Sequence, residues 1–582
     1  MTKMSLKTFA IGSLCLVTLA LLTPATSARA CGGLFCSASA PVNQAAERII
    51  FSKNADGTVT AVVQIQYEGP SEEFAWVLPV PGVPDIQVSS DLAFTRLQLA
   101  SNPQYNLTTR VEGECLDDGT RFAPTGNVDS DGNFGGGGAG GSGGGGINVL
   151  AQGNVGPYDY VVIQPEGIFD RVGDVAVQWL TDEGYDVVPP GGDPEDISDL
   201  LGSYLDGGMN LIAFRLTKGN DQGTIRPIRM TYVSDQPMIP IRPTAVAAND
   251  DMGVMVWVLG ESRAVPVNYR SLELNEALID WLTGGSNYNQ VVVAAGNEAG
   301  GQGFVTERAG PADAYENVVV TDFERDQWEL LQLNLPVFSP ETVLDRSARF
   351  AQWDGYLGVL EDFLPADELE AFIQCPPCDN PLTPFNTEAF MDALSAEVIE
   401  PMLETSELMA SLPYVTRFYT TLSAPEMDLD PLFDFNADLE DVDNVHGAER
   451  VIECDPLITF GEAPSRVELE DGRVVRLPPG ARTWPWNPDE DGAPPANAIV
   501  AQLSTSGPGT VVSDNSAAIE QALRQHNATV PSLDSMGLTT AGGCSVTSNP
   551  TGFLACLGLA LLGLLLWRRR SASRRSGTSY MA

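Results

Sequence analysis

Histidine is scarce in this sequence. Its 582 residues include only two histidines, His446 and His526. A catalytic triad or a metal site built on histidine would therefore rest almost wholly on His446, because His526 lies in the Ser/Thr/Gly-rich segment 504–543, which we expect to be a stalk. His446 follows an acidic run, and a surface histidine among carboxylates is the commoner situation. We find no catalytic constellation in the sequence and assign no catalytic residue.

Basic residues are also few, 32 against 77 acidic residues, which gives a net charge of −45. Such a chain repels nucleic acid and anionic lipid, so we exclude a protein that binds a phosphate backbone. No G-x-G-x-x-G motif follows a predicted strand. The hydrophobic fraction is nevertheless 43%, with 22 Phe, 9 Trp and 14 Tyr. This is ample for packed cores, so the charge indicates an acidic surface rather than disorder.

Residues 1–30 have the layout of a secretory signal peptide. Two lysines precede an apolar run from Phe9 to Leu22, and Ala28-Arg29-Ala30 provides a small-x-small cleavage site. We therefore expect cleavage after Ala30 and a mature chain that begins at Cys31.

Residues 544–582 have the layout of a sorting or membrane tail. Gly543-Cys544 precedes an apolar run from Phe553 to Trp567, which Arg568-Arg569-Arg570 follows at once. As a helix, the 15 residues of this run would span about 22 Å, which is short for a bilayer core of roughly 30 Å. The arginines would stay cytoplasmic and leave the body of the chain outside. A plain C-terminal transmembrane helix is the alternative to a sorting signal.

The order of these parts resembles the myxobacterial C-terminal sorting tail known as MYXO-CTERM. That resemblance implies processing near Cys544 and a lipid-linked fate at the cell surface.

An even number of cysteines lies between the two end segments, which in an exported chain indicates disulfides. They are Cys31, Cys36, Cys115, Cys375, Cys378 and Cys454. The first two are close enough in sequence to pair, as are Cys375 and Cys378, which would leave Cys115 for Cys454. Sequence alone does not decide this connectivity.

The Cys375-Pro-Pro-Cys378 motif has two further interpretations. A redox-active pair would need a helix to begin at the motif, and Pro381 and Pro384 make a helix hard to continue there. In a zinc site built from Cys31, Cys36, Cys375 and Cys378, only the second pair of cysteines would have the usual C-x-x-C spacing. We therefore favour a structural disulfide.

Alternation of apolar and polar residues predicts several strands. We place strands at Arg48–Ser52, Val63–Tyr67, Phe74–Val80, Tyr158–Gln164, Asn210–Leu216, Arg226–Val233 and Val254–Leu259. Helical spacing and capping residues predict helices at Asp91–Ser101, Phe169–Glu183 and Asn275–Leu282. These elements interleave too irregularly for a wound parallel sheet. We predict an α+β fold with mainly antiparallel sheet and packed helices in the N-terminal half.

The sequence divides into five parts. The expected parts are a signal peptide (1–30), an α+β domain (31–295) with a Gly-rich loop (135–146), a second region (303–503), a Ser/Thr/Gly-rich stalk (504–543) and the tail (544–582). The second region looks helical from Glu341 to Ser411 and then irregular or β, with a hairpin over 466–478 that turns at Asp471-Gly472.

Three early motifs carry a family resemblance. Cys31-Gly-Gly-Leu-Phe-Cys36, Ala46-Glu-Arg-Ile-Ile-Phe51 and Phe74-Ala-Trp-Val-Leu-Pro-Val-Pro81 resemble the opening of the bacterial DUF2330 family. Val256-Trp-Val-Leu-Gly260 looks like a later landmark. The family has no established activity, so the resemblance implies only an exported or membrane-linked protein.

Three acidic segments are candidate calcium sites. Residues 127–132 and 487–492 mimic the first half of a calcium loop, but the required Glu is replaced by Gly138 and Ala498. The stretch Asp428–Asp443 is the third. We interpret the first two as Asx-rich turns, and we expect no metal and no cofactor.

These observations favour an exported, membrane-associated protein at the cell surface or outer membrane. Its expected partners are the membrane through the tail, the export and sorting machinery, and an unknown surface ligand, with no nucleic acid. We expect a binding or structural module rather than an enzyme. The alternative is an exported hydrolase that uses carboxylates, which would require a cleft lined by buried Asp or Glu.

Overall fold

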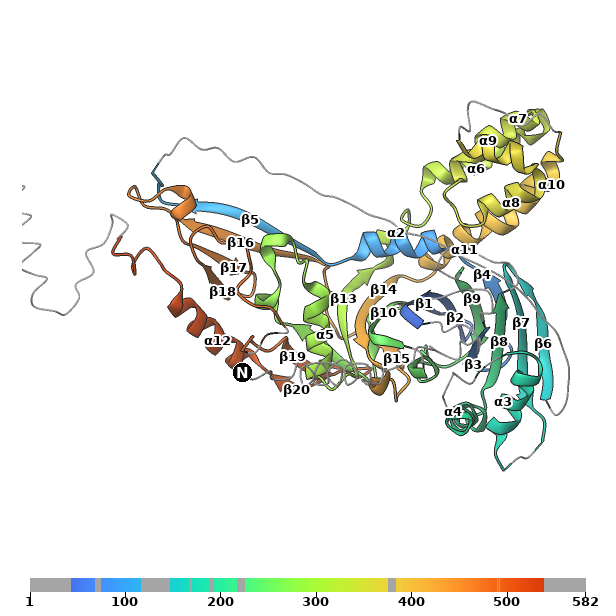
Figure 1. Ribbon diagram of the computed structural model, residues 1–582, viewed down its shortest axis with the longest axis horizontal. Coiled ribbons are helices and arrows are strands. Elements are labelled where there is room, and N and C mark those ends of the chain that lie inside the picture. Colours follow the sequence, from blue (N-terminus) through green and yellow to red (C-terminus); the bar gives the residue numbers. More distant parts are fainter. Residues whose placement is uncertain are drawn as a thin grey trace, which may run out of the picture.

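The structure is a computed structural model that describes most of the chain between the two end segments. The described residues are 43–68, 75–116, 147–167, 170–185, 187, 193–216, 226–246, 248–374, 384–488, 490 and 492–538. Figure 1 shows an elongated molecule, with a β-sandwich at one end, a helical group beside it and a long β-ribbon at the other end.

A ten-stranded sheet runs through the body of the molecule. Its strands, in spatial order, are β20 (Thr510–Asp514), β19 (Asn497–Gln502), β12 (Arg270–Leu274), β13 (Gly303–Pro311), β14 (Tyr414–Leu422), β10 (Ala248–Gly260), β1 (Asn43–Lys53), β2 (Thr58–Glu68), β9 (Ile228–Val233) and β4 (Asp85–Val88). β1 pairs with β10, and β12 with β13, in parallel; the other neighbours are antiparallel.

A second sheet packs on one face of the ten-stranded sheet, over the part that contains β1, and the two sheets form the β-sandwich. Its antiparallel strands are β3 (Ala75–Val80), β8 (Asn210–Leu216), β7 (Tyr158–Pro165) and β6 (Ile147–Val155), in that spatial order. Side chains alternate along β1, so Ile49 and Phe51 face this second sheet while Ile50 faces the opposite core. Two helices, α3 (Val172–Asp182) and α4 (Pro194–Asp206), cover the outer face of the second sheet.

The opposite face of the ten-stranded sheet is covered by helices. α2 (Asp91–Ser101) buries Phe94 and Leu97 against it. The helical group beside the sandwich in Figure 1 comprises α6 (Asp322–Asn334), α7 (Pro340–Ser347), α8 (Tyr356–Phe363), α9 (Ala366–Gln374), α10 (Thr387–Leu394) and α11 (Glu400–Met409).

The ribbon end holds a third sheet and the last helix. Its strands are β18 (Val474–Leu477), β17 (Ser465–Leu469), β16 (Val445–Glu453) and β5 (Gln104–Glu112). Two helices, α5 (Tyr288–Glu298) and α12 (Ser516–Thr529), pack at this end. A short pair, β11 (Ala264–Pro266) and β15 (Phe433–Phe435), completes the strands.

The expected fold class is confirmed at the level of a mixed α+β protein with sheets rich in antiparallel pairs. The helix expected at Asp91–Ser101 and the strand expected at Asn210–Leu216 have the predicted bounds. The expected hairpin forms between β17 and β18, where Gly472 adopts a left-handed φ of 85°. The segment Asn275–Leu282 differs, because the side chains of Asn275 and Asp280 cap two short 3₁₀ turns instead of one helix.

Two expected boundaries do not match the packing. β12 (Arg270–Leu274) pairs with β13 and β19, so one sheet joins strands from before residue 295 and after residue 303. The segment expected as a stalk begins inside the folded body, because β20 pairs with β19 and α12 buries Ile519. Ser and Thr content suggested a linker there, but Ile519 and Leu523 at helical spacing give α12 an apolar face.

Within the described ranges, no helix has both the length and the apolar character needed to cross a membrane. The apolar run 553–567 lies outside the described residues.

Candidate functional site

Two of the cysteines that the sequence analysis names lie within the described residues. Cys115, which follows β5, and Cys454, which follows β16, form a disulfide across 339 residues of sequence. This confirms the pairing expected for these two. The remaining expected residues lie outside the described residues: Ala30, Cys31, Cys36, Cys375, Cys378 and Cys544.

The acidic stretch 428–443 uses its carboxylates to join elements of the fold. Asp430 accepts hydrogen bonds from the Tyr204 hydroxyl (2.7 Å) and the Arg242 backbone N–H (3.1 Å). Asp441 accepts from the Tyr414 hydroxyl at 2.6 Å. In the part of the chain that the structure describes, no three His, Cys, Asp or Glu side chains cluster as a metal site would require.

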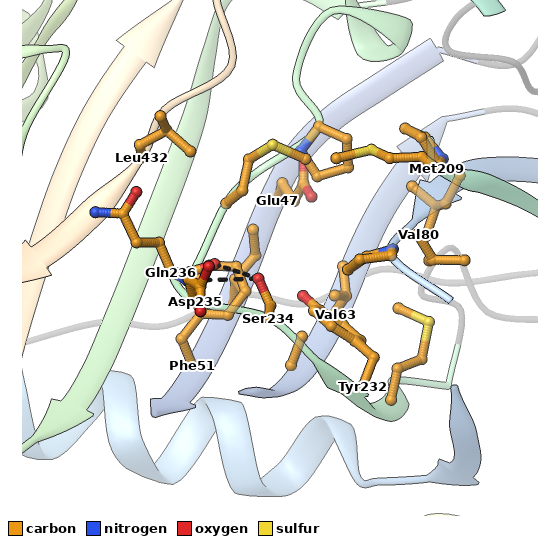
Figure 2. A pocket seen from close by; sticks show the side chains of 18 residues that line it. Glu47, Phe51, Val63, Val80, Met209, Tyr232, Ser234, Asp235, Gln236 and Leu432 are labelled. Atoms are coloured by element: carbon orange, nitrogen blue, oxygen red, sulfur yellow. Dashed lines mark hydrogen bonds between the residues drawn. The ribbon is translucent and has the colours of Figure 1, made fainter. Parts of the chain in front are cut away.

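A cavity of about 270 Å³ lies between the two sheets of the sandwich, and we call it the inter-sheet cavity. It is lined by β1, β2, β3, β9 and the segment 234–240. The side chains that line it are mostly apolar, and they include Phe51, Tyr232 and three methionines, Met209, Met230 and Met238. Figure 2 shows Ser234, Asp235 and Gln236 together on one side of it. Asp235 is exposed, so the cavity comes to the surface there.

Glu47 on β1 contributes a carboxylate to the inter-sheet cavity (Figure 2). It belongs to the same face of β1 as Ile49 and Phe51, and its side chain is buried, with 5% of the residue exposed. From the described part of the chain it accepts one hydrogen bond, from the Gln44 side-chain amide at 3.3 Å. Burial raises the pKa of Glu47 from 4.5 to about 7, and the Gln44 hydrogen bond offsets this only in part.

The charges around Glu47 make this position unusual. The described lining of the cavity contains two carboxylates, Glu47 and Asp235, and no lysine, arginine or histidine. The ion pairs formed by the described residues do not include Glu47. A buried carboxylate usually has a cationic partner or several hydrogen bonds, because desolvation disfavours its charge.

Sequence reasoning did not single out Glu47, although a signal was present. Ala46-Glu47-Arg48-Ile49-Ile50-Phe51 is a strand whose odd positions face the sandwich core. A glutamate in phase with Ile49 and Phe51 is therefore an acidic residue at an inward position.

A second hollow surrounds His446 at the ribbon end. This cleft, of about 480 Å³, is lined by residues of β5, β12, β13, β16 and the β17–β18 turn. His446 Nδ1 lies 2.7 Å from Glu276 Oε1, and each side chain is about one quarter exposed. The imidazole stacks on the buried ring of Tyr105 at 4.7 Å between centroids. His446 is thus a positioned, half-buried residue rather than the free surface histidine that the sequence suggested.

A buried polar chain begins in the wall of this cleft, at Tyr288 and Glu307. The Tyr288 hydroxyl donates to Glu307 Oε1 at 2.6 Å, and Arg417 Nε lies 2.6 Å from Glu307 Oε2. Burial, together with the charge of Glu307, raises the pKa of Tyr288 well above its usual value, so this hydroxyl stays protonated. The second histidine, His526, contacts the Arg476 carbonyl through Nε2 at 2.8 Å and packs on Trp486.

A family model described as "uncharacterized protein conserved in bacteria", DUF2330, matches residues 24–322. The match covers just over half of the 582 residues. The chain belongs to the DUF2330 family. Searches of curated proteins and of solved structures each gave no match. The DUF2330 match contains every described residue that lines the inter-sheet cavity except Leu432, whereas His446 lies beyond it.

Proposed function

We propose that this DUF2330 protein is exported, held at the cell surface by its tail, and binds a small apolar molecule in the inter-sheet cavity. The observation that carries the proposal is the cavity itself, in which an apolar lining surrounds one buried carboxylate. Small-molecule sites are commonly concave and mostly apolar, with a few placed polar groups.

The cavity is large compared with the gaps that packing leaves in a protein core. Protein interiors are as dense as organic crystals, and voids larger than a water molecule are few. An empty apolar cavity is also unfavourable, by about 24 cal/mol for each Å³ in measured series. A cavity of about 270 Å³ that comes to the surface at Asp235 is therefore better explained by an occupant than by loose packing.

The two end segments support export and surface placement. Residues 1–30 have a signal-peptide layout, and Cys544 with the following apolar run and arginines resembles a MYXO-CTERM tail. The disulfide between Cys115 and Cys454 agrees with an oxidising compartment. Mass spectrometry of the native mature protein tests this placement. We expect an N-terminus at Cys31 and loss of the tail near Cys544 with added lipid mass, whereas an intact tail would contradict the sorting proposal.

Binding can be tested by calorimetry with 1-octanol as the apolar probe. Ala61, which is buried and lines the cavity, is changed to Phe to fill the space. We expect 1-octanol to bind the mature protein and not Ala61→Phe, with thermal unfolding used to verify that the variant is folded. Gln521→Ala on the exposed side of α12 is the control. Absence of binding to the unchanged protein, or equal binding to a folded Ala61→Phe, would contradict the proposal.

The His446 cleft supports a second candidate function, ester hydrolysis. Glu276 fixes the imidazole through Nδ1 at 2.7 Å, an arrangement that prepares Nε2 to act as a general base. Nε2 would take a proton from water, the hydroxide would add to the carbonyl carbon, and the C–O bond would break as the alcohol leaves with that proton.

The two histidines provide a matched test of this candidate with p-nitrophenyl acetate. We expect His446→Asn to lower the rate about 100-fold or more, as expected for loss of a general base, and His526→Asn to leave it unchanged. Equal rates for both variants would reject the hydrolase.

A further inference from the structure

We infer that the molecule held in the inter-sheet cavity carries a positively charged nitrogen, an ammonium group that pairs with Glu47. This inference rests on the proposed function, because it names the class of ligand for the same site.

The charge balance of the inter-sheet cavity favours a cationic ligand. Both charged side chains in the described lining are acidic, Glu47 inside and Asp235 at the exposed end. Elsewhere in the ten-stranded sheet, the buried Glu307 has an arginine 2.6 Å away and a tyrosine hydroxyl donor. Among the described residues, Glu47 has only the Gln44 amide, at 3.3 Å. A cationic ligand would supply the partner that the described protein does not provide.

The other side chains that line the cavity also suit a ligand with an ammonium group. Phe51 and Tyr232 present aromatic rings, and the methionines present polarisable sulfur atoms (Figure 2). Aromatic faces attract ammonium groups, most strongly where water is excluded. Methionine adapts its shape to varied apolar groups. The lining therefore suits a cationic head with an apolar body, such as an alkylammonium ion.

The affinity of the cavity for a cation should depend on pH. Gln44 on the same strand contacts the Glu47 carboxylate. Tyr232 of β9, Asp235 in the segment after it and apolar residues of β2 and β3 line the same cavity. Burial raises the pKa of Tyr232 far above neutral pH, so it carries no charge. The pKa of Glu47 is about 7, so acidification below this value neutralises the carboxylate. Affinity for a cation should then fall about tenfold for each pH unit below 7, because one proton competes with one ligand.

The test compares three ligands of similar size by calorimetry at pH 8: hexyltrimethylammonium, 1-octanol and octanoate. The quaternary nitrogen keeps its charge at every pH, so only the protein titrates. We expect the cation to bind best and Glu47→Gln to weaken its binding about 10- to 100-fold, the range for a charge-assisted contact. The 1-octanol affinity should be unchanged in that variant, and the exposed Glu329→Gln on α6 is the matched control.

Other binding results would contradict the inference. If 1-octanol binds as well as the cation and Glu47→Gln changes neither, the inference is overturned and the proposed binding function stands. Preferential binding of octanoate would also overturn it, since a protonated Glu47 would then donate a hydrogen bond to the ligand. If none of the three binds, the proposed function and the inference fail together.

Discussion

Arg417 and Glu307 form an ion pair inside the ten-stranded sheet, with Nε and Oε2 2.6 Å apart and each side chain 1% exposed. The guanidinium also donates to Ser101 and Asn102 and lies over the Trp257 ring. This protein therefore neutralises one buried glutamate with its own side chains. At Glu47, in the same sheet, the described residues provide a single amide hydrogen bond and no ion pair, and this difference marks the site that we propose for a ligand.

Loss of Arg417 should be strongly destabilising. Arg417→Met would leave the Glu307 carboxylate buried without its cation, which costs about 3–5 kcal/mol of unfolding free energy. Urea denaturation at pH 7 measures the effect. The double variant Arg417→Met with Glu307→Leu should recover part of the loss, because it removes the unpaired charge as well. No recovery in the double variant would show that packing, rather than charge, sets the loss.

Glu47→Gln should stabilise the unliganded protein, and increasingly so as the pH rises. The pKa of Glu47 is raised on folding, from 4.5 to about 7, so the folded state holds its proton more tightly than the unfolded state. That stabilisation is fully present below pH 4.5 and disappears as the pH rises through 7. The advantage of Glu47→Gln should thus be about 3 kcal/mol greater at pH 8 than at pH 4. A constant difference between the two proteins would mean that Glu47 is not desolvated.

The disulfide should stabilise the ribbon end of the molecule. Replacing both Cys115 and Cys454 by Ser should lower the free energy of unfolding by about 2–4 kcal/mol in a non-reducing buffer. Gly113→Ala should also be unfavourable, since its Cβ would lie 2.3 Å from the Cys454 carbonyl oxygen and its φ is +87°. If the double serine variant melts at the same temperature as the unchanged protein, the disulfide contributes nothing to its stability.

Residues 510–529 should behave as part of the folded body. Ile519→Ala on α12 removes a side chain with no exposure and should lower the free energy of unfolding by about 2–5 kcal/mol. The exposed neighbour Gln521→Ala should change it by less than about 0.5 kcal/mol. A stalk would predict no effect for either substitution.

Local patterns predicted elements better than they predicted the arrangement of elements. The spacing of Asp91–Ser101 and the Asp471-Gly472 turn each depend on neighbouring residues, and the structure confirms both. The pairing of β12 with β13 and β19 joins residues from three distant segments. Such pairing leaves no local signal, so local patterns place a boundary between residues 295 and 303.

The candidate sites depended on the same long-range contacts. Phase along β1 could have identified Glu47 as inward-facing, but not the absence of a cation in the described lining, because that lining comes from β1, β2, β3, β9 and the segment 234–240. The scarcity of histidine indicates His446 as the candidate for catalysis or metal binding, yet its partner Glu276 lies 170 residues away in the sequence. Composition could not have joined the two.

Proton release on binding is the decisive measurement for the pairing of a ligand with Glu47. Calorimetry of hexyltrimethylammonium binding at pH 7, in buffers of different ionisation enthalpy, counts the protons released by the protein. Because the pKa of Glu47 is about 7, the unchanged protein should release about half a proton for each ligand bound, and Glu47→Gln should release none. Binding without proton release, or equal release from both proteins, would contradict the pairing of the ligand with Glu47.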